Sequence, residues 1–489
     1  MRTNRMLVFM GGLILILGSR LPWISYPVLY GLEGLGYEAL EIGWEDSGYT
    51  TGGIGLILLL IGMIWKGRIG RRYSIPGAIL AALAVLDIFG GFSRILEMAP
   101  ATGFFSATDV GIYVTLVGGL LALGGAVWRP SVNQEKQVPI FLIVLISSGL
   151  ILFVLLGRIR TAAPALEPIT PHAVAADAQP VVIDTDMAAD DWLAILYLLG
   201  RSDVAVQAIT VTGAGEAHCS AGTRNALNLV ALAGRPEIPV ACGREAPLAG
   251  DHAFPTAWRE RVDDLLGLTL PENSRESSGE SAVELLARII QGSPQKVHLI
   301  TLGPLTNVGE ALAAEPGLVM NLAMITVVGG AVEVAGNVGA SSNIENEVAD
   351  WNFYVDPRAA AAVFASGAPI TLTPVDATNY VPVTMAFYSR LERDRTTSVA
   401  EFVYRVLGAQ EQYVRLGSYY FWDPAAAAIA TEEGLATFQE IPLLVVEEEG
   451  AEIGRTLESE RGIIVRVALK VDRERFEALF LEAVNGRLP

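Results

Sequence analysis

The first third of the chain carries the feature that most restricts its fold, a series of long apolar runs with almost no charged residues. The runs occupy residues 6–19, 49–65, 75–92, 110–128 and 139–157. The last two contain no Asp, Glu, Lys or Arg, and each approaches the ~20 residues that a helix needs to cross a bilayer core. We therefore expect residues 1–157 to form an all-α membrane domain of about five transmembrane helices, with the lipid bilayer as its partner.

The shortest run, residues 6–19, has two interpretations, because it lies between Arg5 and Arg20. The arginines that flank a retained anchor can reach the two membrane interfaces, whereas a secretory signal peptide would be removed by cleavage. The sequence ILGSRLPW at the end of the run contains no small-x-small cleavage site, which favours the retained anchor.

The charged loops of this region predict its orientation. Residues 66–72 read KGRIGRR, whereas residues 33–46 contain five acidic residues and no Lys or Arg. By the positive-inside rule, residues 66–72 face the cytoplasm, and counting spans onward places everything after residue 157 outside. We therefore expect an integral protein of the cell membrane whose second part lies on the extracytoplasmic side, although Arg158 and Arg160 argue mildly against this orientation.

The rest of the chain divides into a linker and one large domain. Residues 158–179 are rich in Ala and Pro and have no hydrophobic period, which is typical of a semi-extended linker. Residues 180–489 are long enough for a large α/β enzyme. The formal net charge of −19 argues against nucleic-acid binding, which requires a basic surface. The two cysteines, Cys219 and Cys242, form either one disulfide outside the cell or two buried thiols.

Short apolar runs alternate with helical patterns in this domain. The expected strands lie within residues 180–186, 204–213, 296–303, 321–330 and 369–378. The expected helices include residues 192–199, 222–233, 282–291 and 357–366. This alternation predicts a mostly parallel, open α/β sheet covered by helices, in which ligands bind beyond the carboxyl ends of the strands.

Four aspartates crowd the end of the first expected strand, where DTDMAADD places Asp184, Asp186, Asp190 and Asp191. Helix capping explains one or two of them but not four. An aspartyl-phosphatase pattern, D-x-D-x-T, requires a hydroxyl where Ala188 stands. The remaining interpretation is a site for a hard cation such as Ca²⁺, which binds about six to eight oxygen ligands.

The domain resembles the inosine–uridine preferring nucleoside hydrolase family, whose signature is a strand followed by D-x-D-P-G-x-D-D. Here Met187 and Ala188 replace the Pro-Gly pair. Further landmarks follow in family order: TRNAL at 223–227, LGPLTN at 302–307, GGAVEVAGN at 329–337, ADWNFYVDPRAA at 349–360, PVDAT at 374–378 and FWDPAAA at 421–427. The resemblance implies an N-glycosidic-bond hydrolase that uses Ca²⁺ to cleave a small-molecule nucleoside into base and ribose.

The resemblance also implies roles for individual residues. Asp190 matches the general base, and the calcium ligands match the carboxylates of Asp186, Asp191 and Asp423 with the carbonyl of Leu302. The residues that match substrate contacts are Asn337, Asp350, Asn352, Trp422 and Glu216. Asp184 has no ligand role by this matching, and a supporting hydrogen bond is its expected function.

The chain departs from the family pattern at several of these positions. Trp422 stands where many members carry a proton-donating His, so it either stacks on the base, favouring purines, or packs as a structural aromatic. Asp350 is one methylene shorter than the usual Glu. The segment after Asn337 is longer than usual, which leaves Asn343 and Asn346 as alternatives for its contact.

Two functional hypotheses follow from the sequence. The first is a membrane-anchored hydrolase that acts on extracellular nucleosides. The alternative is a non-catalytic membrane receptor whose hydrolase-like domain binds a ribosyl ligand. Since a binding protein has no need of a general base, the presence of Asp190 beside Asp186, Asp191 and Asp423 favours the enzyme. The sequence predicts no particular oligomeric state.

Overall fold

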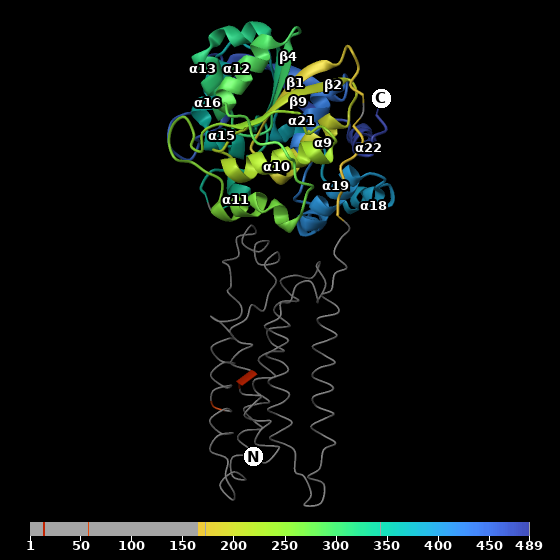
Figure 1. Cartoon of the computed structure of the whole chain (residues 1–489). Coiled ribbons are helices and arrows are strands. Elements are labelled where there is room, and N and C mark those ends of the chain that lie inside the picture. Colours follow the sequence, from red (N-terminus) through yellow and green to blue (C-terminus); the bar gives the residue numbers. More distant parts are fainter. Residues whose placement is uncertain (1–12, 15–56, 58–164, 172, 343, 489) are drawn as a thin grey trace, which may run out of the picture. The chain divides into compact units, whose positions relative to one another are not determined.

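The computed structural model describes residues 13–14, 57, 165–171, 173–342 and 344–488. Apart from three residues, the five apolar runs therefore lie outside the described residues, as does the expected membrane domain. Among the helices that the structure describes, none combines the length and apolar character that a membrane crossing requires. The chain divides into two units between Pro164 and Ala165, and the fold described below belongs to the second unit (Figure 1).

A single mixed sheet forms the centre of residues 165–488. Its nine strands are arranged in the order β3-β2-β1-β4-β5-β6-β9-β7-β8. All neighbouring strands are parallel except at β7, which is antiparallel to both β9 and β8. The strands are β1 (Gln179–Thr185), β2 (Val204–Val211), β3 (Val240–Cys242), β4 (Val297–Thr301), β5 (Leu322–Val328), β6 (Ile370–Thr373), β7 (Ala436–Val445), β8 (Thr456–Glu458) and β9 (Ile463–Val471).

Helices connect the strands and cover the sheet. The longer helices are α9 (Ala189–Leu199), α10 (Cys219–Leu232), α11 (Thr256–Asp263), α12 (Ala282–Gly292), α13 (Thr306–Ala314), α16 (Pro357–Phe364), α18 (Met385–Arg393), α19 (Ser398–Ala409), α21 (Trp422–Thr431) and α22 (Arg473–Val484). The shorter ones are α14 (Val338–Ser341), α15 (Trp351–Val355), α17 (Val375–Thr378), α20 (Glu411–Leu416), η1 (Leu265–Gly267) and η2 (Pro316–Asn321). Capping side chains stabilise the start of some of these helices. Before α12, for example, Ser281 and Glu284 form a reciprocal capping box.

Each face of the sheet has its own hydrophobic core. Along β1, Val181 and Ile183 pack into a cluster that includes α9, α10, α19, α21 and α22, whereas Val182 packs into a second cluster with α12, α13 and α16. Figure 1 shows these two groups of helices on opposite sides of the sheet. Because successive side chains of a strand point to opposite faces, an uninterrupted apolar run such as β1 requires cover on both faces. The expected mostly parallel α/β sheet covered by helices is therefore confirmed for this unit.

The antiparallel β7–β9 pair was not expected from the sequence. The exposed positions of β7 and β9 alternate with buried ones along much of each strand, so neither strand reads as the apolar run that identifies a buried parallel strand. Sequence separation adds to the difficulty, since β9 pairs in parallel with β6, which lies about ninety residues earlier in the chain.

The segment before β1 lies against the domain although it has no regular secondary structure. Leu166 is buried, the Ile169 N–H donates to the Leu232 carbonyl at 2.9 Å, and the Ala175 N–H donates to the Ser202 carbonyl at 2.8 Å. The part of the expected linker that the structure describes is thus hydrogen-bonded to the domain.

Candidate active site

The candidate site lies where parallel strands of the sheet end. Asp186 follows β1, Glu216 lies in the loop after β2, and Leu302 follows β4. Because these strands run in the same direction, their carboxyl ends share one edge of the sheet, which is where open α/β sheets bind ligands. The fold thereby brings residues from three separate segments to the same edge.

The loop between β1 and α9 is held in a strained conformation by its own side chains. Met187 has a left-handed backbone with a φ of 60°, which costs a non-glycine residue about 1 kcal/mol. Its N–H donates to Thr185 Oγ1 at 2.9 Å, and its carbonyl accepts from Trp192 Nε1 at 2.9 Å. Thr185 Oγ1 donates in turn to Asp191 Oδ1. Strain of this kind persists only where the surroundings impose it. The hydrogen bond from Thr185 holds Asp191 in position.

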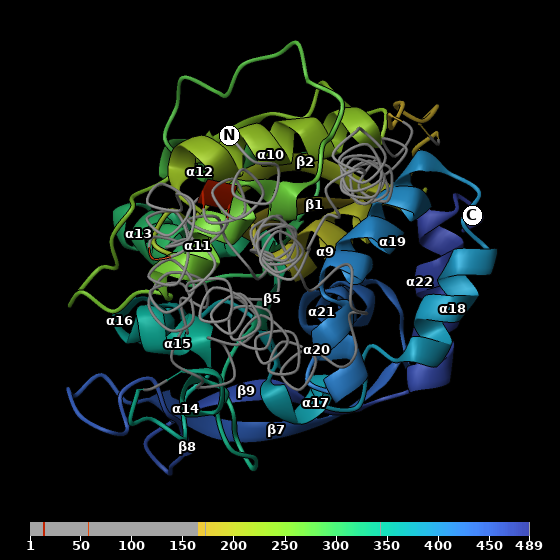
Figure 2. The ribbon, with the colours of Figure 1, turned by 90° about the horizontal axis from the view of Figure 1, so that it is seen from below.

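Carboxylates from two helices converge beside this loop. Asp190 and Asp191 lie in the first turn of α9, and Asp423 lies in the first turn of α21. The two helices pack side by side (Figure 1 and Figure 2). One oxygen from each of the three carboxylates lies within 4.8 Å of the others. Asp191 Oδ2 is buried and has no hydrogen-bond partner among the described residues. Such a donor set, all oxygen and partly unsatisfied, fits a hard cation such as Ca²⁺.

Asp186 lies next to this group in a space that neighbouring glycines leave open. A Cβ atom on Gly303 would lie 2.7 Å from Asp186 Cβ, and a Cβ atom on Gly215 would overlap the same side chain. Asp186 Oδ2 accepts a hydrogen bond from the Glu216 N–H at 2.9 Å. The structure thus brings Asp186 to the site, but Asp190 rather than Asp186 is the third member of the group whose oxygens converge.

Burial makes the negative charges of the cluster costly. It raises the pKa of Asp190 to about 7 and that of Asp191 to about 6, and neighbouring carboxylates add to both shifts. Burial, followed by the charges of the other carboxylates, raises the pKa of Asp186 and of Asp423 well above the usual range. Buried like charges are stable together only when a cation compensates them or protons neutralise them. The electrostatics therefore agree with the geometry in indicating a cation site.

Asn352 and Asp350, at the start of α15, are engaged by backbone groups. Asn352 Nδ2 donates to the carbonyls of Leu302 at 3.0 Å and Val328 at 3.1 Å, which joins the ends of β4 and β5. Asp350 caps α15, and its Oδ1 also accepts from the Gly330 N–H at 2.7 Å. Asp350 thus holds the loop after β5, whereas Asn352 Oδ1 has no partner among the described residues.

The structure shows different hydrogen bonds for two of the three candidate asparagines, Asn346 and Asn337. Asn346 is buried, its Nδ2 donates to the Ile453 carbonyl at 2.8 Å, and its Oδ1 accepts two backbone N–H groups. Its polar atoms are therefore used to hold the loop. Asn337 Oδ1 accepts from the Trp351 N–H at 3.0 Å, while its Nδ2 has no partner among the described residues. Asn343 lies outside the described residues.

Trp422 begins α21, directly before Asp423, and two tyrosine rings flank its indole. The ring centroids of Tyr419 and Trp422 are 5.3 Å apart in an edge-to-face arrangement, and those of Tyr420 and Trp422 are 5.6 Å apart. The indole is half-buried. An aromatic ring held in this way, and still partly exposed beside the carboxylates, can stack on a planar base.

Two further acidic residues at this edge differ in their surroundings. Burial, and then the charges of Asp186 and Asp190, raise the pKa of Glu216 well above its usual range, so Glu216 lies close to the cluster. Asp184 is instead enclosed, and its Oδ1 accepts from Thr210 Oγ1 at 2.6 Å and Asn307 Nδ2 at 2.8 Å. Asp184 thereby joins β1 to β2 and to α13, which is a supporting role within the sheet.

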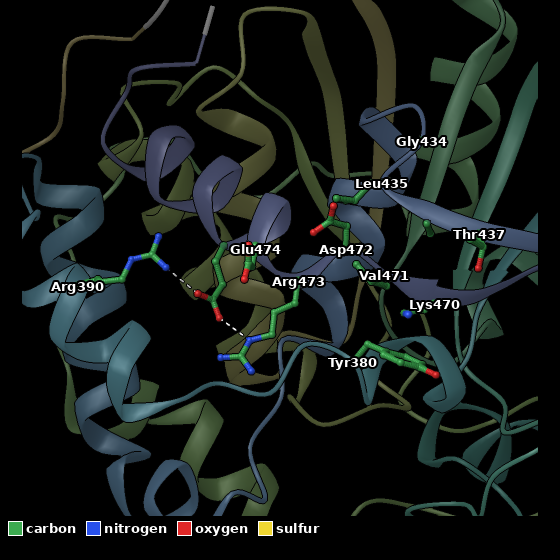
Figure 3. Close-up of a pocket in the computed structure, with 12 residues that line it drawn as sticks. Tyr380, Arg390, Gly434, Leu435, Thr437, Lys470, Val471, Asp472, Arg473 and Glu474 are labelled. Atoms are coloured by element: carbon green, nitrogen blue, oxygen red, sulfur yellow. Dashed lines mark hydrogen bonds and ion pairs between the residues drawn. The ribbon is translucent and has the colours of Figure 1, made fainter.

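A separate surface cavity of about 960 Å³ lies where β9 meets α22 (Figure 3). Arg390 and Arg473 in its wall both pair with Glu477 at 2.8 Å. None of the converging carboxylates lines this cavity, so it is distinct from the candidate active site.

Sequence reasoning missed two residues that the structure brings to the site. Thr185 orients Asp191, and the only signal for it was its position between two aspartates. Tyr419 packs against Trp422, and its buried hydroxyl has no hydrogen-bond partner in the part of the chain that the structure describes. The pair of tyrosines before FWDP was a signal for an aromatic cluster, but it could not indicate which hydroxyl is buried.

Comparisons with known proteins agree with this arrangement. Residues 181–478 match the family described as inosine–uridine preferring nucleoside hydrolase. A pyrimidine-specific ribonucleoside hydrolase of Klebsiella pneumoniae is 34% identical over 229 residues, which cover 46% of this chain and 70% of that protein.

Two solved structures are similar to the described domain. A plant nucleoside hydrolase and a purine-preferring ribonucleoside hydrolase from Gardnerella vaginalis are each 28% identical to this chain, with a TM-score of 0.56. Each match covers 63% of this chain and 99% of the other. The fold is therefore shared over almost the whole length of those two structures.

Proposed function

The chain belongs to the inosine–uridine preferring nucleoside hydrolase family, and on that premise we propose that it is a membrane-anchored, Ca²⁺-dependent ribonucleoside hydrolase that prefers purine nucleosides. Its reaction class is that of the family, hydrolysis of the N-glycosidic bond. The observation that carries the proposal is the convergence of Asp190, Asp191 and Asp423 within 4.8 Å at the ends of the strands.

The residues present fit a calcium ion. Asp191 and Asp423 offer converging oxygens, and Asp191 Oδ2 has no hydrogen-bond partner in the described part of the chain. Asp186 and the Leu302 carbonyl lie at the same edge of the sheet. When bound, the ion would supply positive charge that offsets the carboxylates and would orient the ribose hydroxyls and a water molecule.

Asp190 is the group placed to accept a proton from the attacking water. It is the least buried of the three converging carboxylates, so its oxygen is the most accessible to substrate and water. The neighbouring Asn352 Oδ1 is available to accept a hydrogen bond from a ribose hydroxyl. Cleavage of a glycosidic bond passes through an oxocarbenium-like sugar, and the surrounding carboxylates favour that positive charge.

Substitution of Asp190 tests this mechanism. In the full-length chain supplied with Ca²⁺, Asp190→Asn should lower the rate of base release by about 100-fold or more, the usual contribution of a general base, while nucleoside binding persists. A rate equal to that of the wild type would rule out Asp190 as the base. Tight riboside binding by a wild type that releases no base would instead support the receptor hypothesis.

We propose a preference for purines because Trp422 offers a large aromatic platform beside the cluster. The similar proteins differ in this respect, since one is pyrimidine-specific and another purine-preferring. Trp422→Leu should lower kcat/KM for inosine up to about fivefold more than for uridine, because stacking contributes on the order of 1 kcal/mol. Equal losses for both nucleosides would argue against stacking on the base.

The apolar runs of residues 6–157 support a membrane anchor, and the cysteines support an extracytoplasmic domain. Cys219 and Cys242 form a disulfide between the start of α10 and the end of β3, with a Cα–Cα distance of 5.6 Å, and disulfides persist mainly in oxidising compartments. Intact cells that produce the chain should therefore hydrolyse nucleosides added to the medium. Activity that appears only after cell lysis would place the domain inside.

A further inference from the structure

Tyr419 carries a polar group that the fold buries without satisfying. Its side chain is almost fully enclosed, and its hydroxyl oxygen has no hydrogen-bond partner among the described residues. Burying an unpaired hydroxyl costs free energy, and a phenylalanine would fill the same space without that cost. The hydroxyl is therefore unexplained by the packing of the protein alone.

The backbone holds Tyr419 in a fixed position. Its carbonyl accepts from the Val383 N–H at 2.9 Å, the Phe421 N–H donates to the Val381 carbonyl at 3.0 Å, and Tyr420 forms an isolated bridge with Pro382. Residues 419–421 are thus bound as an extended segment along residues 381–383. A ring held in this way is pre-positioned rather than mobile.

Tyr419 lies beside Trp422, which directly precedes Asp423 of the candidate active site. Its ring packs edge-on against Trp422, at 84° between the planes. Burial, followed by the charges of Asp190, Glu216 and Asp423, raises the pKa of this hydroxyl, while Arg261 acts in the opposite direction. These charged groups belong to α9, the loop after β2, α21 and α11. In these surroundings the hydroxyl keeps its proton and can donate a hydrogen bond.

We propose that Tyr419 Oη donates a hydrogen bond to the departing base, an inference that rests on the proposed placement of the base beside Trp422. When the C1′–N bond breaks, its electron pair stays on the base and the water oxygen bonds to C1′. The water loses one proton to Asp190, and the base finally takes up one proton from solvent, which balances the reaction. Tyr419 remains protonated throughout and stabilises the negative charge that develops on the base.

The substitution Tyr419→Phe in the full-length, Ca²⁺-loaded chain tests this role with two substrates. The base of inosine is a poor leaving group that needs a hydrogen-bond donor, whereas 4-nitrophenyl riboside releases a stable phenolate that does not. We expect kcat/KM for inosine to fall about 100-fold, the usual effect of losing one such donor, and kcat/KM for the nitrophenyl riboside to change less than about twofold. The thermal midpoint should stay the same or rise, because an unpaired buried hydroxyl is removed.

Tyr420→Phe is the matched control, since Tyr420 also contacts Trp422 but its hydroxyl is not among the buried unpaired groups. It should leave both rates and the midpoint unchanged. Unchanged inosine hydrolysis in Tyr419→Phe, equal losses on both substrates, or a large fall in the midpoint would each overturn the proposal. A wild type that cleaves neither substrate would overturn the proposed function itself and this inference with it.

Discussion

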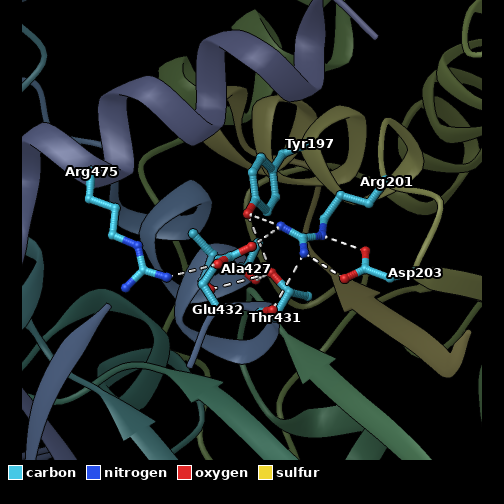
Figure 4. A network of polar contacts seen from close by, with 8 residues as sticks. Tyr197, Arg201, Asp203, Ala427, Thr431, Glu432 and Arg475 are labelled. Carbon is cyan, nitrogen blue, oxygen red and sulfur yellow. Dashed lines mark hydrogen bonds and ion pairs between the residues drawn. The ribbon is translucent and has the colours of Figure 1, made fainter. Parts of the chain in front are cut away.

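Arg201 Nη1 lies 2.7 Å from Glu432 Oε1, and this contact joins the far ends of the two helices that carry the converging carboxylates. Arg201 follows α9 and Glu432 follows α21. Arg201 also donates to Tyr197 Oη at 2.8 Å and pairs with Asp203 at 2.7 Å, as Figure 4 shows. The network therefore fixes the position of α9 relative to α21, and with it the separation of Asp191 from Asp423.

Replacing this arginine should loosen the site as well as the fold. Arg201→Met should lower the free energy of unfolding by about 3 kcal/mol, because removing one partner of a buried ion pair leaves the other poorly compensated. Glu432 keeps its contact with Arg475 at 3.1 Å, so the loss in the free energy of unfolding should not exceed about 3 kcal/mol. We also expect a weaker Ca²⁺ affinity, measured by calorimetric titration, because the two helices can then shift.

The pair Arg390–Glu477 provides the control for Arg201. Glu477, like Glu432, is largely buried and accepts two arginines, Arg390 and Arg473, which point into the cavity of Figure 3. This pair joins α18 to α22. Although α22 also packs against α9 and α21, the hydrogen bonds of Arg390 and Glu477 involve no residue of those two helices among the described residues. Arg390→Met should therefore lower the thermal midpoint without changing Ca²⁺ affinity. If the two variants weakened Ca²⁺ binding equally, the position of α9 relative to α21 would not be the cause.

Removal of one carboxylate from the cluster should stabilise the metal-free protein and abolish its stabilisation by Ca²⁺. Asp423→Asn should raise the thermal midpoint of the metal-free protein by at least about 2 °C, because burial and like charges raise the pKa of Asp423 and oppose its ionised form. The same variant should lose the stabilisation that Ca²⁺ gives the wild type. Thermal scans with Ca²⁺ and with a chelator measure both effects.

Asp376 offers a contrasting substitution. Its two carboxylate oxygens accept the N–H groups of Val332 and Glu333 at 2.8 Å each, so its charge is satisfied by backbone donors. Asp376→Asn should lower the midpoint whether or not Ca²⁺ is present. A metal-free Asp423→Asn protein that is less stable than the wild type would contradict our account of the cluster.

The parallel sheet and the first loop could be predicted because their signals are local. The apolar run of β1, followed directly by Asp184, Asp186, Asp190 and Asp191, identifies a strand, a turn and a helix within twenty residues. Asp423 was matched through its neighbours in FWDP, although nothing local indicates that α21 lies beside α9. That proximity arises from packing between segments more than two hundred residues apart.

The structural roles of several residues were not visible in the sequence for the same reason. The sequence indicates Asp350 and Asn346 as candidates for substrate contacts, and the structure adds that their polar atoms also bind backbone groups of loops that only the fold brings near. Tyr419 shows the reverse case, since its unpaired hydroxyl is apparent only when all its neighbours are known. Sequence patterns identify residue types at strand ends, and the three-dimensional contacts decide which of their atoms remain free.

The close approach of Gly303 to Asp186 predicts sensitivity to a single methyl group. In Gly303→Ala the new Cβ would lie 2.7 Å from Asp186 Cβ and 2.9 Å from Asp186 N, so the backbone of the loop must move. Overpacking of this kind costs about 1 to 3 kcal/mol. We expect lower stability and weaker Ca²⁺ binding. Gly317→Ala is the control, because no atom lies within 4 Å of its Cβ position; a Gly303→Ala protein that binds Ca²⁺ like this control would contradict the prediction.

His298 on β4 should make the domain sensitive to acid. Burial lowers its pKa from 6.5 to about 4, and its Nε2 lies 2.8 Å from Thr326 Oγ1. His298 therefore takes up a proton below pH 6.5 in the unfolded chain, but only below about pH 4 in the folded chain. The contribution of this group to stability is complete above pH 6.5 and decreases as the pH falls through this window. Between pH 7 and pH 4.5 the wild type should lose about 2 to 3 kcal/mol more than His298→Gln, measured by urea unfolding. Contributions of the carboxylates cancel in this difference, and equal losses in both proteins would show that His298 is protonated in the folded state.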